Sequence, residues 1–415
     1  MKSFFQKIIA NPLFTGSMVM VVGSNLFNLG QFVYHFLSGR LLGKVYYGDL
    51  AVLISIIGII SIIQLSIGLT IVKFIASAKK KIEVPNLIKW FNLWAILLGG
   101  TVAILTLIFS PWLIPFLNLN QSLSFYMLVP LLFITVVAFT QRAILQGLLR
   151  FGKYVSSLFI EALTKIILTI VFVLAGFYVF GAMLGILIGV FFSLLFTWFS
   201  LFKFLSGKRG NMPKMSPLVK YSLPVFIQGL AFTSMYSTDL ILVKHFFSAS
   251  EAGIYASLAV LGRVALFFSA PVTQFMFPVV ARRFSHGVPY HNIFYLAALF
   301  VVLMPLPIIA FYFFFPEFLI VLFYGKDFIE GASSLWWFGV FMGFLGLATL
   351  LSHFYLSIGK TLVVIPFALT AILQAVLIWF IHPNLLTVIK LSVFCAALLT
   401  LAFLVYFPWH DRKTL

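Results

Sequence analysis

The sequence predicts an all-α, multi-pass membrane protein of twelve transmembrane helices, arranged as two parallel-repeat six-helix lobes around a central cavity. The composition, the spacing of the apolar runs and the placement of basic residues carry this prediction. The 415 residues are 63% hydrophobic and 9% charged, with a mean hydropathy of +1.15, whereas soluble domains are about 45–50% apolar and about 25% charged. A globular core cannot bury so much apolar surface. A soluble enzyme, a disulfide scaffold and a disordered chain are therefore excluded.

Twelve apolar runs are each long enough to cross a bilayer, which takes about 20 helical residues. Several are longer, which indicates tilted helices or ends that extend past the membrane. The first run is interpreted as a retained span, because it is longer than the core of a signal peptide and no small-residue cleavage site follows it. The longest connector, 315–332, has no room for a soluble domain. The predicted spans are 12–38, 49–77, 88–109, 124–146, 154–176, 180–205, 217–245, 252–281, 291–314, 333–357, 361–381 and 385–408.

The basic residues define the predicted orientation. Lys and Arg number 27 against 9 acidic residues, which gives a net charge of +18. The basic residues in connectors and near span ends are assigned to alternate sides: 20 fall on the cytoplasmic side, Arg142 among them, and 4 fall on the outer side, Lys244 among them. Lys165, Arg263 and Lys390 lie deeper inside spans. Cytoplasmic loops are enriched in Lys and Arg, so both termini are expected in the cytoplasm. The net charge therefore reflects membrane topology, and no nucleic-acid partner is expected. Basic loops such as Lys79–Lys81 are either solvated or in contact with anionic lipid headgroups.

The sequence shows no pattern of a metal, cofactor or catalytic centre. Cys395 is the only cysteine, and the seven histidines lack ligand spacing, so a disulfide within the chain and a thiolate metal cluster are excluded. A membrane polymerase or ligase would need a sizeable outer loop with catalytic groups, and 315–332 holds no paired acid and base. We expect neither an enzyme nor a cofactor.

An internal repeat divides the chain into two halves. Residues 48–53 match 253–258 at three positions, 205 residues later, and Gly152–Lys153 matches Gly359–Lys360 after 207 residues. Six spans per half is an even number, so both halves enter from the same side. Such parallel repeats are typical of transporters that rock two lobes about a central site. The predicted lobes are 1–205 and 217–415, joined by a cytoplasmic linker at 206–216.

Polar side chains on the first span of each half predict the lining of the cavity. On the first span they fall within about a third of the helix circumference, and the seventh span has a comparable stripe. Lipid cannot solvate such a stripe, so it faces protein or water; hydrogen bonding between helices is the alternative. The stripes consist of Ser24, Asn25, Asn28, Gln31 and His35, and of Tyr221, Gln228, Tyr236 and Asp239.

Ionisable groups inside spans are costly in hydrocarbon and mark candidate functional sites. Arg263 has no acidic residue within one turn and shares its face with Gln274. A guanidinium binds phosphate bidentately, so Arg263 is either an anion site or the partner of a distant helix. Glu161 and Lys165, four residues apart, predict an internal ion pair, or a gated pair that opens for an anionic headgroup or a proton. Lys390 is expected to extend toward the interface.

Two stretches resemble the Wzx-type polysaccharide flippases, the "polysaccharide biosynthesis proteins" of the multidrug/oligosaccharidyl-lipid/polysaccharide (MOP) superfamily, which shares its fold with MATE multidrug extruders. They are Ala143–Lys153 and the region from Asn25 through Arg40–Gly43 to Tyr47–Ala51. The resemblance implies movement of an isoprenoid-pyrophosphate-linked oligosaccharide from the cytoplasmic to the outer leaflet by alternating access. It also implies a bacterial or archaeal plasma membrane, and polysaccharide polymerase or glycosyltransferase machinery as a partner.

The resemblance and the polar residues together predict the site. A cation-coupled drug exporter of the same superfamily would need a carboxylate-rich cavity, whereas these spans favour basic groups. A major-facilitator-type transporter shares the architecture but not the quoted motifs. Glu161 and Asp239 are the predicted ion-coupling or gating groups. The predicted cavity residues are Arg263, Lys165, Asn25, Asn28, Gln31, His35, Gln228, Tyr236 and Gln274.

Overall fold

The computed structural model describes residues 12–77, 83–205 and 216–411, and nearly all of them are helical. These three ranges contain no strand, so the predicted all-α fold class is confirmed. The predicted linker, apart from Ser216, and the basic residues Lys79–Lys81 lie outside the described residues.

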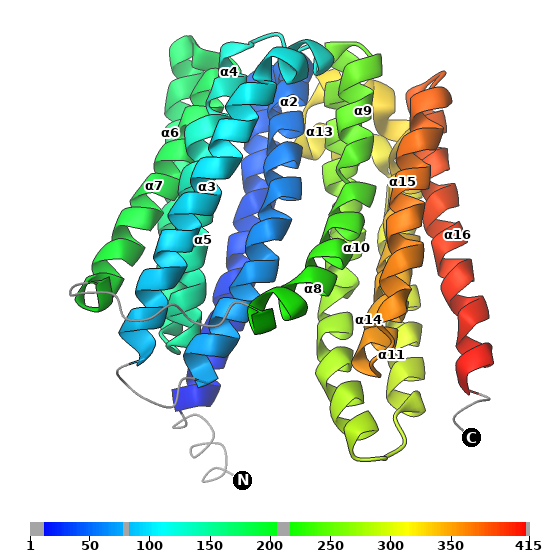
Figure 1. Cartoon of the computed structure of the whole chain (residues 1–415). Helices are drawn as coiled ribbons and strands as arrows, with labels where there is room; N and C mark the ends of the chain where they lie inside the picture. The colour runs from blue at the N-terminus through cyan, green and yellow to red at the C-terminus, as the bar shows by residue number, and fades with distance from the viewer. Residues whose placement is uncertain (1–11, 78–82, 206–215, 412–415) are drawn as a thin grey trace, which may run out of the picture. The chain divides into compact units, whose positions relative to one another are not determined.

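The described residues form two compact units. Within each unit the helices lie side by side along a common direction (Figure 1). Residues 43–59 pack with the second unit, so the observed division differs there from the predicted lobe that ends at residue 205. The first unit holds the described part of Met1–Leu42 together with Ile60–Phe226, and the second holds Gly43–Ile59 together with the described part of Ile227–Leu415.

Long helices make up both units, and short helical turns connect some of them. The N-terminal half of the chain forms α2 (Pro12–Ser77), α3 (Glu83–Phe116), α4 (Leu123–Tyr126), α5 (Leu128–Gly147), α6 (Phe151–Phe172), the π-helix η1 (Val173–Phe177) and α7 (Tyr178–Leu205). The C-terminal half forms α8 (Ser216–Met235), α9 (Thr238–Phe246), α10 (Ala249–Ser285), α11 (His291–Leu303), α12 (Pro305–Phe314), α13 (Pro316–Phe323), the 3-10 helix η2 (Lys326–Ser334), α14 (Leu335–Ser357), the 3-10 helix η3 (Thr361–Val363), α15 (Val364–Phe380) and α16 (Leu385–Asp411).

Among the described residues, nine helical segments are long and apolar enough to cross a membrane. The number is ten when the bent pair Phe226–Met235 and Thr238–Phe246 counts as one span. Two of the nine, Val22–Gln64 and Phe151–Phe204, have 43 and 54 residues, and each extends over two of the predicted spans. All twelve predicted spans lie on helical segments, so the protein is a multi-pass membrane protein.

Glycine interrupts the regular helix inside both long segments. Gly43 in α2 has φ 67° and ψ 173°, and Gly176 in the π-helix has φ 87° and ψ 11°. A Cβ atom makes such positive φ values unfavourable. Glycine therefore permits the change of direction between two consecutive spans that the sequence pattern had already separated.

The predicted connector at 315–332 is largely helical, which corrects the expectation of a loop. Pro316 opens α13, and η2 follows from Lys326. Proline is favourable in the first helical turn, where its missing N–H has no intrahelical role. Two short helices thus take up most of this connector in the second unit.

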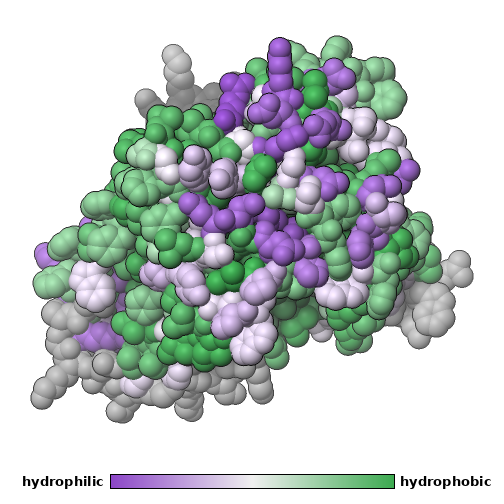
Figure 2. All heavy atoms as spheres, turned by 90° about the horizontal axis from the view of Figure 1, so that it is seen from above, coloured by the Kyte–Doolittle hydropathy of each residue, from purple (hydrophilic) through white to green (hydrophobic). Residues whose placement is uncertain are grey.

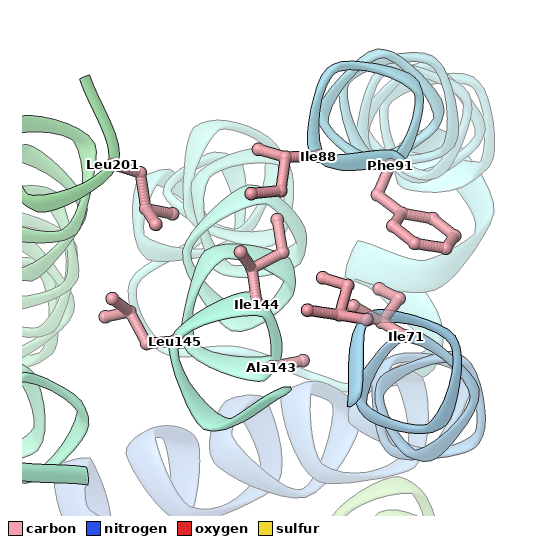
Figure 3. Packing of buried hydrophobic residues seen from close by; sticks show 8 residues of the cluster. Ile71, Ile88, Phe91, Ala143, Ile144, Leu145 and Leu201 are labelled. Carbon is pink, nitrogen blue, oxygen red and sulfur yellow. The ribbon is translucent and has the colours of Figure 1, made fainter. Parts of the chain in front are cut away.

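Apolar side chains close the first unit at the ends of α2, α3, α5 and α7. Figure 3 shows Ile71, Ile88, Phe91 and Ile144 converging from three helices, with Leu201 approaching from α7. Figure 2 shows the face seen from above, at the other end of these helices, where hydrophilic residues are visible and the margin of the view is mainly hydrophobic. Polar ends and apolar flanks suit helices whose sides face lipid.

Three glycines at every fourth position let α7 approach α6 closely. A Cβ atom on Gly181 would lie 2.8 Å from the Cβ of Phe172, and one on Gly185 would lie 2.6 Å from the Oγ1 of Thr169. On Gly189 it would lie 2.9 Å from the carbonyl oxygen of Glu161. Small residues at this spacing allow close backbone contact between membrane helices.

Gly185→Leu is therefore expected to lower the free energy of unfolding by roughly 1–3 kcal/mol, the usual cost of overpacking. The new side chain would force α7 away from α6. Melting temperature in detergent measures the effect. Gly100→Leu on α3 is the matched control, because a Cβ there meets nothing within 4 Å. Equal melting temperatures for the two variants would contradict the prediction.

Candidate functional site

Lys165 lies inside the first unit with only 4% of its surface exposed. Its ammonium group donates a hydrogen bond to Oε1 of Gln31 on α2, and it lies 4.2 Å from the centre of the Tyr34 ring. The first and fifth predicted spans are thus joined by a buried cation, an amide and an aromatic face. A cation over an aromatic ring is stabilised by the negative charge on the face of the ring.

Glu161 pairs with Arg142 rather than with Lys165, which corrects the predicted internal pair. The Arg142 Nη2 donates to the carboxylate of Glu161 and to Oγ of Ser193 at 2.5 Å, and its Nε donates to Oγ of Ser157 at 3.1 Å. Sequence analysis had counted Arg142 among the basic residues of the cytoplasmic side, but it is only 8% exposed. The planar guanidinium of Arg142 can donate to groups of α6 and α7 at the same time, and it holds the Glu161 carboxylate as one of them.

The predicted residues of the first span differ in how much of each side chain is exposed. Asn25 and Asn28 are exposed, whereas Gln31 and His35 are half-buried. The ring of His35 lies 6.0 Å from that of Tyr34. Exposed amides within an apolar span require a polar environment. These positions suit the lining of a water-filled cavity. Gln31, which belongs to the same polar stripe, is hydrogen-bonded to Lys165.

The second unit holds a break between α8 and α9, within the predicted seventh span. The two helices are bent by 43°. Neither Gly nor Pro stands at the break; its sequence is Thr233-Ser-Met-Tyr-Ser-Thr-Asp239. Hydroxyl and carboxylate side chains compete with the backbone for hydrogen bonds and so weaken a helix here. The Oγ of Ser234 and the Oγ1 of Thr238 are 2.7 Å apart across the break.

Arg263 of α10 contacts this break. Its Nη2 donates to the carbonyl oxygen of Tyr236 at 2.7 Å, and its guanidinium carbon lies 5.0 Å from the centre of the Tyr236 ring. The buried Nε has no hydrogen-bond acceptor among the described residues. Arg263 and Tyr236, both predicted as cavity residues, are therefore brought together.

Asp239 accepts a hydrogen bond from the hydroxyl of Tyr255 at 2.7 Å and from the backbone N–H of Leu240 at 2.8 Å. It is 1% exposed. A carboxylate in the first turn of a helix also interacts favourably with the helix dipole. Asp239 thus holds the start of α9, a role that the sequence alone did not indicate.

The two other predicted residues of this unit, Gln228 and Gln274, form no hydrogen bond with Arg263. Gln228 donates to Oγ of Ser352 at 2.9 Å, and Gln274 is exposed, three turns further along α10. Gln374 of α15, which sequence analysis missed, donates to the carbonyl oxygen of Met235 at 3.0 Å. A glutamine in an otherwise apolar span was the available signal.

A buried ion pair joins residues 43–59 to the rest of the second unit. The Nζ of Lys244 lies 2.6 Å from Oδ1 of Asp49, and both side chains are 1% exposed. Nearby, the hydroxyls of Tyr47 and Tyr324 are 3.1 Å apart. Sequence analysis had placed Lys244 on the outer side and had quoted Asp49 only for its family motif.

The two segments matched by the internal repeat contact each other. A Cβ atom on Gly48 would lie 2.8 Å from the backbone N of Gly253, and one on Gly253 would lie 1.7 Å from the carbonyl oxygen of Lys44. Both glycines therefore serve close backbone packing. This contact explains physically why the repeat preserves glycine at that position.

Known structures share this fold. An inward-facing MATE transporter of the MOP superfamily has a TM-score of 0.77 at 16% identity, covering 92% of this chain and 94% of that one. A MOP-superfamily transporter from Pyrococcus furiosus, described as having a binding pocket of reverse polarity, has a TM-score of 0.64 at 17% identity over 96% and 94%. A Vibrio cholerae MATE transporter has 0.65 at 15% identity over 98% and 97%. The chain therefore shares the fold of these transporters.

The family follows from the sequence itself. Residues 13–284 match the model of the polysaccharide biosynthesis protein family, and the chain belongs to that family. No curated protein matches the sequence. The chain is thus a polysaccharide biosynthesis protein with the fold of MOP-superfamily transporters, as its motifs predicted.

Proposed function

We propose that this protein moves an isoprenoid-pyrophosphate-linked oligosaccharide from the cytoplasmic to the outer leaflet of a bacterial or archaeal plasma membrane by alternating access. Both termini are cytoplasmic in this proposal. Membership of the polysaccharide biosynthesis family supports a glycan substrate. The proposed partners are anionic lipid headgroups and polysaccharide polymerase or glycosyltransferase machinery.

The observation that carries the proposal is a cation in each unit that forms no direct ion pair with a carboxylate among the described residues. Within the described residues, no carboxylate oxygen lies within 4.0 Å of the nitrogen atoms of Lys165 or Arg263. A charge inside a membrane span is costly unless it is neutralised. A pyrophosphate offers the missing negative charge, and Arg263 can bind it bidentately. A cationic drug would instead place a further positive charge beside each of them.

Exposed amides within each unit are the proposed sugar-binding groups. Asn25, Asn28 and Gln274 each offer donors and acceptors that match the hydroxyl groups of a sugar. Glu161 and Asp239 remain the proposed coupling or gating groups. Each now has a named partner, Arg142 or Tyr255, which it would have to exchange during an ion-coupled cycle.

Depletion of the protein in cells is the direct test. The leaflet that holds the lipid-linked oligosaccharide is read on oriented vesicles with a membrane-impermeant, sugar-specific probe. We expect accumulation on the cytoplasmic leaflet, reversed by re-expression of the wild-type protein but not of Arg263→Met at equal membrane abundance. Lys390→Met is the matched control, because Lys390 is exposed and lies over the Trp337 ring at 5.2 Å. An unchanged leaflet distribution would overturn the proposal and favour a small-molecule exporter.

A further inference from the structure

At the break between α8 and α9, regular backbone hydrogen bonds of the helix are replaced by bonds to side chains. In a continuous α-helix the N–H of residue i bonds to the carbonyl of residue i−4, so Leu240 would donate to Tyr236. Here Leu240 donates to Oδ1 of Asp239 instead. The carbonyl of Tyr236 accepts from Nη2 of Arg263. A carboxylate and a guanidinium have taken the two ends of the missing bond.

A second carbonyl at the break is held in the same way. Met235 would accept from Asp239 in a continuous helix, and it accepts from Nε2 of Gln374 at 3.0 Å. The same Nε2 lies 2.8 Å from Oγ of Ser392 on α16. Side chains of α10 and α15 therefore satisfy consecutive carbonyls that would otherwise be left unpaired in an apolar environment, which is costly.

The bond from Arg263 to Tyr236 competes with anion binding. A bidentate contact along the side of a guanidinium uses Nε–H together with a neighbouring Nη–H. The Arg263 Nε is buried without an acceptor, whereas Nη2 is already bonded to Tyr236. Nη2 carries two N–H groups, so an anion displaces the Tyr236 carbonyl when it takes, together with Nε–H, the Nη2–H that this carbonyl now holds. Tyr236 then recovers a partner most directly by accepting from Leu240, which closes the helix.

We propose that Arg263 holds the α8–α9 break open and that capture of the substrate pyrophosphate by Arg263 lets the break close. The inference rests on the proposed function for the identity of the anion. It assigns Tyr236 and Gln374 as positioning groups, because they act on the substrate through Arg263 and the helix. Substrate binding is thereby converted into a change in the shape of the seventh span.

Hydrogen–deuterium exchange of the segment 236–242 tests this switch on the full chain in lipid nanodiscs. Closure gives the amides of residues 238–240 regular helical bonds, which slow their exchange. We expect farnesyl pyrophosphate to slow exchange in the wild type at least threefold and farnesol, which lacks the phosphates, to have no effect. Binding is followed independently by the ligand-dependent rise in melting temperature.

Variants separate the switch from ligand binding. Arg263→Met removes the donor to Tyr236, so exchange of residues 238–240 is expected to be slow without ligand and insensitive to farnesyl pyrophosphate. Gln374→Met is expected to slow exchange without ligand yet to keep the response. Thr370→Ala is the control, because its hydroxyl bonds within α15 to the Pro366 carbonyl and should leave the exchange of the break unchanged.

The possible failures are distinguishable. If farnesyl pyrophosphate binds and exchange at residues 238–240 does not slow, the switch is wrong and the proposed function stands. If Arg263→Met exchanges as fast as the wild type without ligand, Arg263 does not hold the break open and the inference is also overturned. If no pyrophosphate binds to the wild type, the proposed substrate is wrong and the anion step of the switch is overturned with it.

Discussion

Asp49→Asn is expected to lower the free energy of unfolding of the second unit by about 3–5 kcal/mol, because it leaves the Lys244 ammonium buried without a charged partner. Both side chains of this pair are 1% exposed, so water cannot take the place of the carboxylate. Lys244→Gln should be as damaging for the reverse reason. Chemical or thermal unfolding in detergent measures both losses.

The double variant Asp49→Asn/Lys244→Gln is the decisive comparison. It replaces two charges by two amides that can bond to each other, so we expect it to be more stable than either single variant. Lys44→Gln is the matched control: the Lys44–Glu330 pair has side chains 27% and 66% exposed, and such pairs contribute about 0–1 kcal/mol. Equal losses for Asp49→Asn and Lys44→Gln would contradict the argument from burial.

Gly253→Ala is expected to be at least as damaging as typical overpacking, which costs about 1–3 kcal/mol. The added Cβ would lie 1.7 Å from the carbonyl oxygen of Lys44, and the obstacle is backbone, which cannot rotate away as a side chain can. The segment carrying Gly48 would have to separate from α10. Melting temperature and resistance to limited proteolysis report this separation.

Gly58→Ala is the control for that prediction. It lies in the same segment, 43–59, and its added Cβ would meet nothing within 4 Å. Alanine favours helix over glycine by about 1 kcal/mol, so this variant should be as stable as the wild type or slightly more stable. If Gly253→Ala and Gly58→Ala have the same melting temperature, the close contact at Gly253 is dispensable.

Hydropathy, the basic-residue bias and the motifs predicted the fold class, the spans and the family, because each depends on properties that act locally along the chain. The two spans on either side of Gly43, and the two on either side of Gly176, could be told apart in the sequence for the same reason. The contacts between helices were harder to predict from the sequence. The pairing of Glu161 with Arg142 depends on which helix lies beside α6, and the i,i+4 spacing of Glu161 and Lys165 suggested a nearer partner.

The candidate site shows the same limit. The polar stripes include Gln31, Tyr236 and Asp239, and polar groups in apolar helices need partners. Their actual partners come from residues 134, 27 and 16 positions away in sequence. The break at Met235–Thr238 carried no Gly or Pro signal, so the role of Arg263 and Gln374 in satisfying its carbonyls required the three-dimensional arrangement.

The inclusion of residues 43–59 in the second unit has a consequence for biosynthesis. The ribosome makes this segment before residues 60–226, and only afterwards does it make Lys244 and Gly253. Asp49 therefore enters its helix long before the ammonium group that neutralises it exists. A fragment that begins after residue 59 would lack part of the second unit from the start, so we expect the C-terminal half of the chain to reach its native stability only when the N-terminal segment is supplied.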